Sequence, residues 1–95
     1  MNAATEYLKD QLKKLVDKYK NIKLEYGYEK EYDNHIIEVM PSVTFEDAEF
    51  YDIEMSIIKD FYSKFPDQIA IFVYPGALEF TDCDETTEIK GILYK

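Results

Sequence analysis

The segment from Ile69 to Tyr74, with the sequence IAIFVY, constrains the fold more than any other part of the chain. It carries no charged residue, it is rich in β-branched and aromatic side chains, and it is bounded by Pro66-Asp67 and Pro75-Gly76. A short run of this kind predicts a β-strand. Both of its faces are apolar, which predicts a position in the middle of a sheet with at least one face fully covered. The remaining chain must therefore supply flanking strands and covering helices.

Two segments have the three- and four-residue spacing of amphipathic helices. The first is expected from a cap at Asn2 or Thr5 to about residue 20. Its apolar stripe consists of Leu8, Leu12, Leu15, Val16 and Tyr19. The second is expected over residues 45–64, where Thr44 and Asp47 resemble a capping box. Its apolar residues cover roughly 200° of the helix circumference. Such a wide arc predicts packing on the sheet and also on the first helix or a partner.

Strands are expected on both sides of the second helix. Residues 22–28 alternate between apolar and polar, residues 29–34 form a charged hairpin loop, and residues 35–40 return as a second strand. After the Ile69 strand, Leu78 and Phe80 predict a short strand, and residues 87–94 a last one with Gly91 as a bulge. We therefore expect one domain of residues 1–95 in the α+β class. It is a two-layer sandwich, with a mainly antiparallel sheet of four to five strands and two helices on one face, in the order α-β-β-α-β-β-β.

The charge balance bounds the class of partner. The chain has a formal net charge of −9, and all 11 of its basic residues are lysine. Because nucleic-acid binding needs cationic contacts to phosphate and favours arginine for bidentate recognition, direct binding to DNA or RNA is not expected. Residues 1–23 carry a net charge of +3 and residues 24–95 a net charge of −12. Such an acidic excess keeps a small domain soluble and also attracts basic partners.

The sequence also indicates a compartment. No segment has the length and apolarity of a membrane span, and no short apolar stretch follows a basic start at the N-terminus. The single cysteine, Cys83, cannot form an internal disulfide. We therefore expect a cytoplasmic protein with no membrane contact.

Few residues are available for catalysis, so we do not expect this protein to be an enzyme. His35 and Cys83 are the one pair that could supply a base and a thiol nucleophile, but an exposed turn cysteine is usually incidental. The acidic turn at residues 82–88 lacks the glycine and the second helix of an EF-hand, and the ligands for a zinc site are too few. The three glycines are isolated, so there is no phosphate-binding loop. No metal and no cofactor are expected.

Acidic and tyrosine side chains instead predict a face that binds another protein, because exposed tyrosines with a charged rim are typical of binding hot spots. The first hairpin contributes Glu25, Tyr26, Tyr28, Glu29, Glu31, Tyr32 and Asp33, and the outer face of the second helix contributes Glu49, Asp52 and Asp60. The expected function is that of a small acidic protein-binding domain. Its sharper form is an inhibitor or decoy of a basic protein that handles nucleic acid, with carboxylates in the places of phosphates.

Two alternatives remain open. Glu54 falls within the apolar arc of the second helix, where burial would raise the pKa of its carboxyl group. This position is compatible with a small-ligand or enzymatic pocket between that helix and the sheet, or with a structural pairing of Glu54 at the sheet edge. The other alternative is a structural domain that self-associates into a homo-oligomer, because the apolar arc of the second helix is wider than its own sheet can cover.

Overall fold

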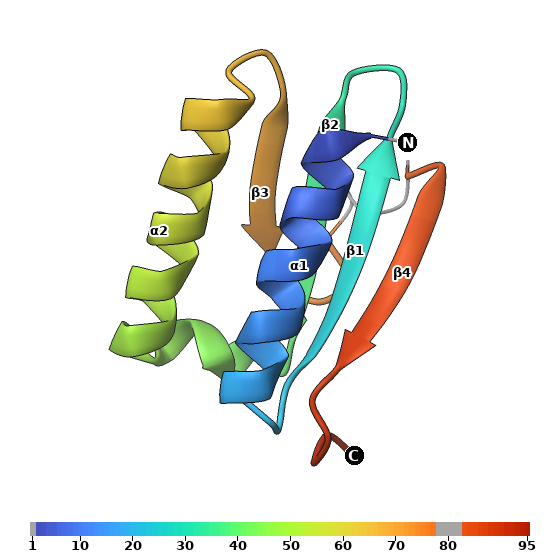
Figure 1. Cartoon of the computed structure of the whole chain (residues 1–95). Helices are drawn as coiled ribbons and strands as arrows, with labels where there is room; N and C mark the ends of the chain where they lie inside the picture. The colour runs from blue at the N-terminus through green and yellow to red at the C-terminus, as the bar shows by residue number, and fades with distance from the viewer. Residues whose placement is uncertain (1, 78–82) are drawn as a thin grey trace.

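The computed structural model describes residues 2–77 and 83–95. Its elements, in chain order, are α1 (Ala3–Lys18), β1 (Lys23–Glu29), β2 (Asn34–Met40), a 3-10 helix η1 (Ser42–Glu46), α2 (Ala48–Lys64), β3 (Ile69–Val73) and β4 (Glu85–Lys90). The four strands form one sheet in the order β3-β2-β1-β4, and both helices lie on one face of it (Figure 1). The predicted α+β sandwich with two helices is confirmed. The short strand expected around Leu78 and Phe80 lies outside the described residues.

The sheet is mixed. β1 pairs with β2 and with β4 in antiparallel orientation, whereas β2 and β3 are parallel. β2 and β3 are parallel because α2 lies between them in the sequence and returns the chain to the end of the sheet where β2 begins. The last strand begins and ends earlier than residues 87–94, since Gly91 leaves β4 and donates a backbone hydrogen bond to the Ile22 carbonyl at 2.8 Å.

The predicted central position of the Ile69 strand is wrong. Among the described residues β3 has one neighbouring strand, β2, and so lies at an end of the sheet. Its faces are also less covered than predicted, since Ile69 is exposed and Ile71, Phe72 and Val73 are partly buried. The Tyr62 hydroxyl of α2 bonds both backbone groups of Ala70 on the outer edge, and Ala70 itself is buried. On the opposite sheet face, the Gly76 N–H donates to Glu38 at 2.8 Å, so the chain leaving β3 turns onto that face.

The second helix begins later than predicted. Residues 42–46 form η1, and Asp47 caps α2 by accepting a hydrogen bond from the Phe50 N–H at 2.9 Å. Thr44 is buried within η1 and does not cap α2. An aspartate is itself a strong cap, and this preference outweighs the capping-box spacing. At the other helix the expected cap Asn2 is confirmed, since its side chain accepts from the Ala4 N–H.

The core lies between the helices and the covered face of the sheet. Four of the five predicted stripe residues of α1 are buried, and Tyr19 is partly buried. They pack with Leu24, Tyr26, Ile37, Val39, Phe50, Ile57, Phe61, Ala70 and Ile89. Within the described part of the chain, neither helix is long and apolar enough to cross a bilayer.

Candidate protein-binding surface

Three segments that are distant in the sequence bring carboxylates to one end of the sheet. They are the β1–β2 hairpin, the loop between α2 and β3, and the start of β4, all at the same end in Figure 1. Backbone hydrogen bonds join them: Ile69 N–H donates to the Asp33 carbonyl at 3.2 Å, and Asp84 N–H donates to the Tyr28 carbonyl at 2.9 Å. The carboxylates of this acidic end belong to Glu29, Glu31, Asp33, Asp67, Asp84 and Glu85. Lys30, the one basic residue of these segments, pairs with Glu85 at 3.4 Å.

Local contacts fix part of this surface. Asp33 has a positive φ of 51° and accepts a short hydrogen bond from the Tyr28 hydroxyl. That bond is the main cause of the raised pKa of Tyr28, which therefore stays protonated and donates. Asn34 closes the loop by donating to the Glu29 carboxylate at 2.8 Å. In contrast, the Tyr32 side chain is 63% exposed and Glu31 is exposed, so both are accessible to a partner.

A polar network lies beneath the acidic end. The Tyr26 hydroxyl lies 2.5 Å from Nδ1 of His35, and Nε2 of His35 lies 2.6 Å from Oε1 of Gln68. An amide oxygen can only accept, so Nε2 carries the proton, and Nδ1 accepts from Tyr26. Thr5 then donates to the Tyr26 hydroxyl at 2.9 Å. Burial lowers the pKa of His35, which is neutral, and raises the pKa of Tyr26 to about 12.

This network settles the role of two predicted residues. Tyr26 is 2% exposed and belongs to the core, so a docking protein cannot reach its ring. Both ring nitrogens of His35 are engaged, by Tyr26 and Gln68, and neither is available as the base for Cys83. In the described ranges 2–77 and 83–95, no group of three or more histidine, cysteine and acidic side chains is placed to hold a metal ion.

The other predicted acids lie away from the acidic end. Glu25 is on the opposite face of β1 from Tyr26 and pairs with Lys23 at 3.6 Å. Two of the acids on α2 face α1: Glu49 pairs with Lys18 at 3.5 Å, and Asp60 accepts from the Tyr7 hydroxyl at 2.5 Å. Asp52 is exposed. The structure therefore unites the hairpin acids with Asp67, Asp84 and Glu85, and not with the acids of α2.

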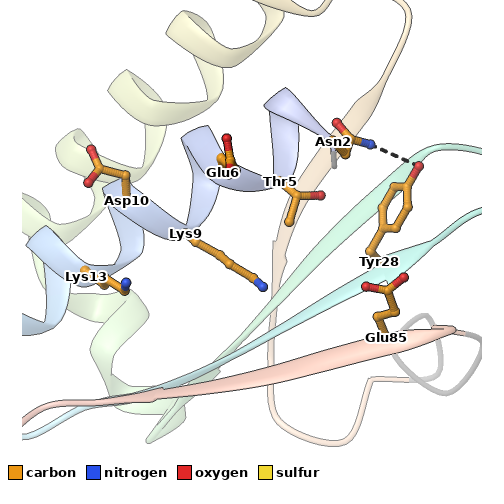
Figure 2. Close-up of a pocket in the computed structure, with 8 residues that line it drawn as sticks. All are labelled: Asn2, Thr5, Glu6, Lys9, Asp10, Lys13, Tyr28 and Glu85. Atoms are coloured by element: carbon orange, nitrogen blue, oxygen red, sulfur yellow. Dashed lines mark hydrogen bonds between the residues drawn. The ribbon is translucent and has the colours of Figure 1, made fainter.

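A groove of about 480 Å³ adjoins the acidic end, between α1 and strands β1 and β4 (Figure 2). It is lined by Asn2, Thr5, Glu6, Lys9, Asp10, Lys13, Tyr28 and Glu85. Figure 2 shows the Lys9 side chain extending from α1 toward the strands, and its ammonium lies 5.8 Å from the centre of the Tyr26 ring. Tyr28 of the hairpin and Glu85 of β4 line this groove and also belong to the segments of the acidic end. The α1 residues of the groove carry no signal in the sequence, because their position depends on how α1 packs on β1.

Glu54 is partly buried on α2, and burial raises the pKa of its carboxyl group. Within the described part of the chain it makes no hydrogen bond or ion pair. It lines neither the groove beside α1 nor a second, shallower groove formed by Ser56, Lys59, Asp60 and Ser63. The predicted desolvation of Glu54 is thus present without a described pocket around it.

Comparison of the chain with protein families, curated proteins and solved structures finds no match. The function therefore has to follow from the residues of this chain. The acidic end is the place where most of the predicted hairpin residues meet, and the fold adds three carboxylates to them. The sequence signal for Asp84 and Glu85 was their acidic turn, whereas nothing in the sequence placed Asp67 beside the hairpin.

Proposed function

We propose that this domain is not an enzyme and that it binds a basic protein through its acidic end. The observation that carries the proposal is the meeting of six carboxylates with one lysine on three joined segments. The net charge of −9 has the same sign, so it adds to the local field. A field of this kind speeds the encounter with a cationic partner and makes association sensitive to salt.

The surface has the make-up of a binding site with an aromatic contact. Tyr32 stands exposed among Glu31 and Asp33, and a tyrosine supplies contact area at a low cost in conformational entropy. The hydrogen bonds of Tyr28 with Asp33 and of Asn34 with Glu29 hold the hairpin in one shape before a partner arrives. A preorganised surface loses less entropy on binding.

The class of partner follows from the charge. Proteins that handle nucleic acid present clusters of lysine and arginine that contact phosphates. Carboxylates on a rigid surface can occupy the same cationic sites, so the sharper form of the proposal is an inhibitor or decoy of such a protein. In that case nucleic acid and this domain compete for one surface of the partner.

The test uses two variants with the same charge change. Glu31→Lys with Asp67→Lys alters the acidic end, and Asp17→Lys with Glu46→Lys alters the opposite end of the molecule. Each replaces two acids by lysines and changes the net charge from −9 to −5. All four acids are exposed, and none has a side-chain hydrogen bond or ion pair in the described residues, so both variants should fold.

The measurement is affinity capture from a lysate of the native host at low and at high salt, with the captured proteins quantified by mass spectrometry. We expect a basic protein that the parent chain and the Asp17–Glu46 variant retain at low salt. The Glu31–Asp67 variant should not retain this protein at low salt, and the parent chain should not retain it at high salt. Equal loss by both variants would show that net charge, and not the acidic end, determines binding, and full retention by the Glu31–Asp67 variant would refute a role for the acidic end. Capture of no basic protein by the parent chain would refute the proposal.

A further inference from the structure

An exposed apolar stripe runs along α2 on the side away from α1. Its members, Tyr51, Met55, Ile58 and Tyr62, follow one another at steps of four, three and four residues, so they form one line along the helix. Tyr51 is 55% exposed, Met55 39% and Tyr62 37%, and Ile58 is partly buried. The contact between the Tyr62 hydroxyl and the Ala70 backbone places this stripe beside the outer edge of β3.

Two charges of opposite sign flank the stripe on its solvent side. Asp52 and Lys59 are both exposed, and neither has an ion pair in the described part of the chain. They are seven residues apart, which is two helical turns or about 10 Å, and too far for a pair within one helix. Along α2 the solvent-side flank of the stripe therefore carries a negative charge followed by a positive charge, and neither is paired within the described part of the same chain.

We propose that α2 forms the interface of a homodimer in which two copies pack antiparallel through this stripe. A two-fold axis between Met55 and Ile58 reverses the direction of the second helix. Met55 then packs on the partner subunit's Ile58, and Tyr51 on the partner subunit's Tyr62. On an antiparallel pair the same flank of each helix meets itself. The negative end of one flank therefore lies opposite the positive end of the other. Asp52 pairs with Lys59 of the partner subunit, and the two-fold axis repeats this ion pair, so each dimer has two.

The structure favours pairing through the helix and not through the sheet edge. Both backbone groups of Ala70 on the outer edge of β3 are occupied by the Tyr62 hydroxyl, at 3.2 and 3.3 Å. A second β3 strand could not pair there without displacing Tyr62. A contact made by one stripe on each helix is below the roughly 1,200 Å² of a standard interface, so we expect a dissociation constant in the micromolar range.

The test is sedimentation equilibrium at about 0.15 M salt, with protein from about 1 µM to about 1 mM. The parent chain should change from a mass of 11.3 kDa to twice that value as concentration rises. Asp52→Lys and Lys59→Asp should each weaken the dimer about tenfold, because each replaces two attractions by two repulsions. The double variant, Asp52→Lys with Lys59→Asp, should restore the affinity of the parent chain. Met55→Asp should abolish the dimer.

The Asp52→Lys variant makes the test sharp. It changes the net charge from −9 to −7 and so reduces the general repulsion between two copies. If net charge alone governed association, this variant would associate more strongly, whereas the proposed pairing predicts weaker association. A parent chain that stays monomeric at the highest concentration would overturn the proposal. A dimer whose affinity is unchanged by Asp52→Lys would have a different interface or a parallel arrangement, and it would also overturn the proposal. A double variant that dimerises as weakly as the single variants would overturn it as well.

Discussion

The Tyr26 hydroxyl lies 2.5 Å from Nδ1 of His35, on the sheet face that the helices cover. Both side chains are buried, and the bond continues through Nε2 to Gln68 in the loop before β3. This chain of hydrogen bonds links β1 and β2 to the segment that carries Asp67. The same contacts thus satisfy the polar atoms of the core and hold one part of the acidic end in place.

Removal of the Tyr26 hydroxyl should destabilise the fold. In Tyr26→Phe, Nδ1 of the buried His35 loses its donor and Thr5 loses its acceptor, which should lower the free energy of unfolding by about 1–3 kcal/mol. Urea unfolding at neutral pH measures this change. Tyr74→Phe is the matched control, because Tyr74 is 61% exposed and its hydroxyl makes no hydrogen bond among the described residues. Equal stability of the two variants would contradict the assigned network.

The buried imidazole should also make stability depend on pH. Burial lowers the pKa of His35 in the folded state, so the unfolded chain binds more protons once the pH falls below about 6.5. The free energy of unfolding should therefore decrease as the pH falls from about 7.5 to 5.5, by at most about 1.4 kcal/mol per unit for one group. Urea unfolding across this range should give a slope that His35→Gln flattens. The raised pKa of Glu54 acts in the opposite direction, so Glu54→Gln should not flatten the slope. A slope that His35→Gln leaves unchanged would assign it to other groups.

Local patterns predicted the elements well, and sheet order lay beyond them. The stripe from Leu8 to Val16 and the alternation from Leu24 to Tyr28 each report one buried face of one element, and both were confirmed. The prediction of a central position for the Ile69 strand failed because apolar residues on both faces do not show how many strands pair with it. In the structure only Ala70 of the five β3 residues is buried, and the contacts of Tyr62 with Ala70 and of Gly76 with Glu38 at this edge have no local signature in the sequence.

The same distinction applies to the candidate surface. Glu29, Glu31 and Asp33 share one hairpin, so their proximity follows from a local turn. Asp67 and Asp84 join them only because β3 pairs with β2 and β4 pairs with β1, which are long-range choices. Tyr26 shows the reverse case. Its place in a period-two strand fixed its face, but its burial depends on α1, which covers it and donates from Thr5.

The two glycines at the ends of the last strands should respond differently to alanine. At Gly91 an added Cβ would lie 2.3 Å from the Lys20 carbonyl oxygen, a backbone atom that cannot yield without moving the chain. At Gly76 nothing lies within 4 Å, but φ is +80°, so the cost is conformational and about 1–2 kcal/mol. We expect Gly91→Ala to cost more than Gly76→Ala, at the upper end of the roughly 1–3 kcal/mol for overpacking, or beyond it. Thermal unfolding of both variants checks the order, and the reverse order would contradict the close approach at Gly91.

The contact between Tyr62 and Ala70 gives a prediction for the outer edge of the sheet. In Tyr62→Phe the ring stays, but the Ala70 N–H loses its acceptor, a bond worth about 0.5–1.5 kcal/mol. Amide hydrogen exchange at Ala70 should become faster by roughly three- to tenfold, since 1.4 kcal/mol corresponds to a factor of ten. Tyr51→Phe is the control on the same stripe, because the Tyr51 hydroxyl has no hydrogen bond in the described part of the chain. Exchange measured by NMR at low protein concentration keeps self-association out of the comparison. If Ala70 exchanged at the parent rate in both variants, Tyr62 would not protect this edge, and β3 would be open to pairing with another strand.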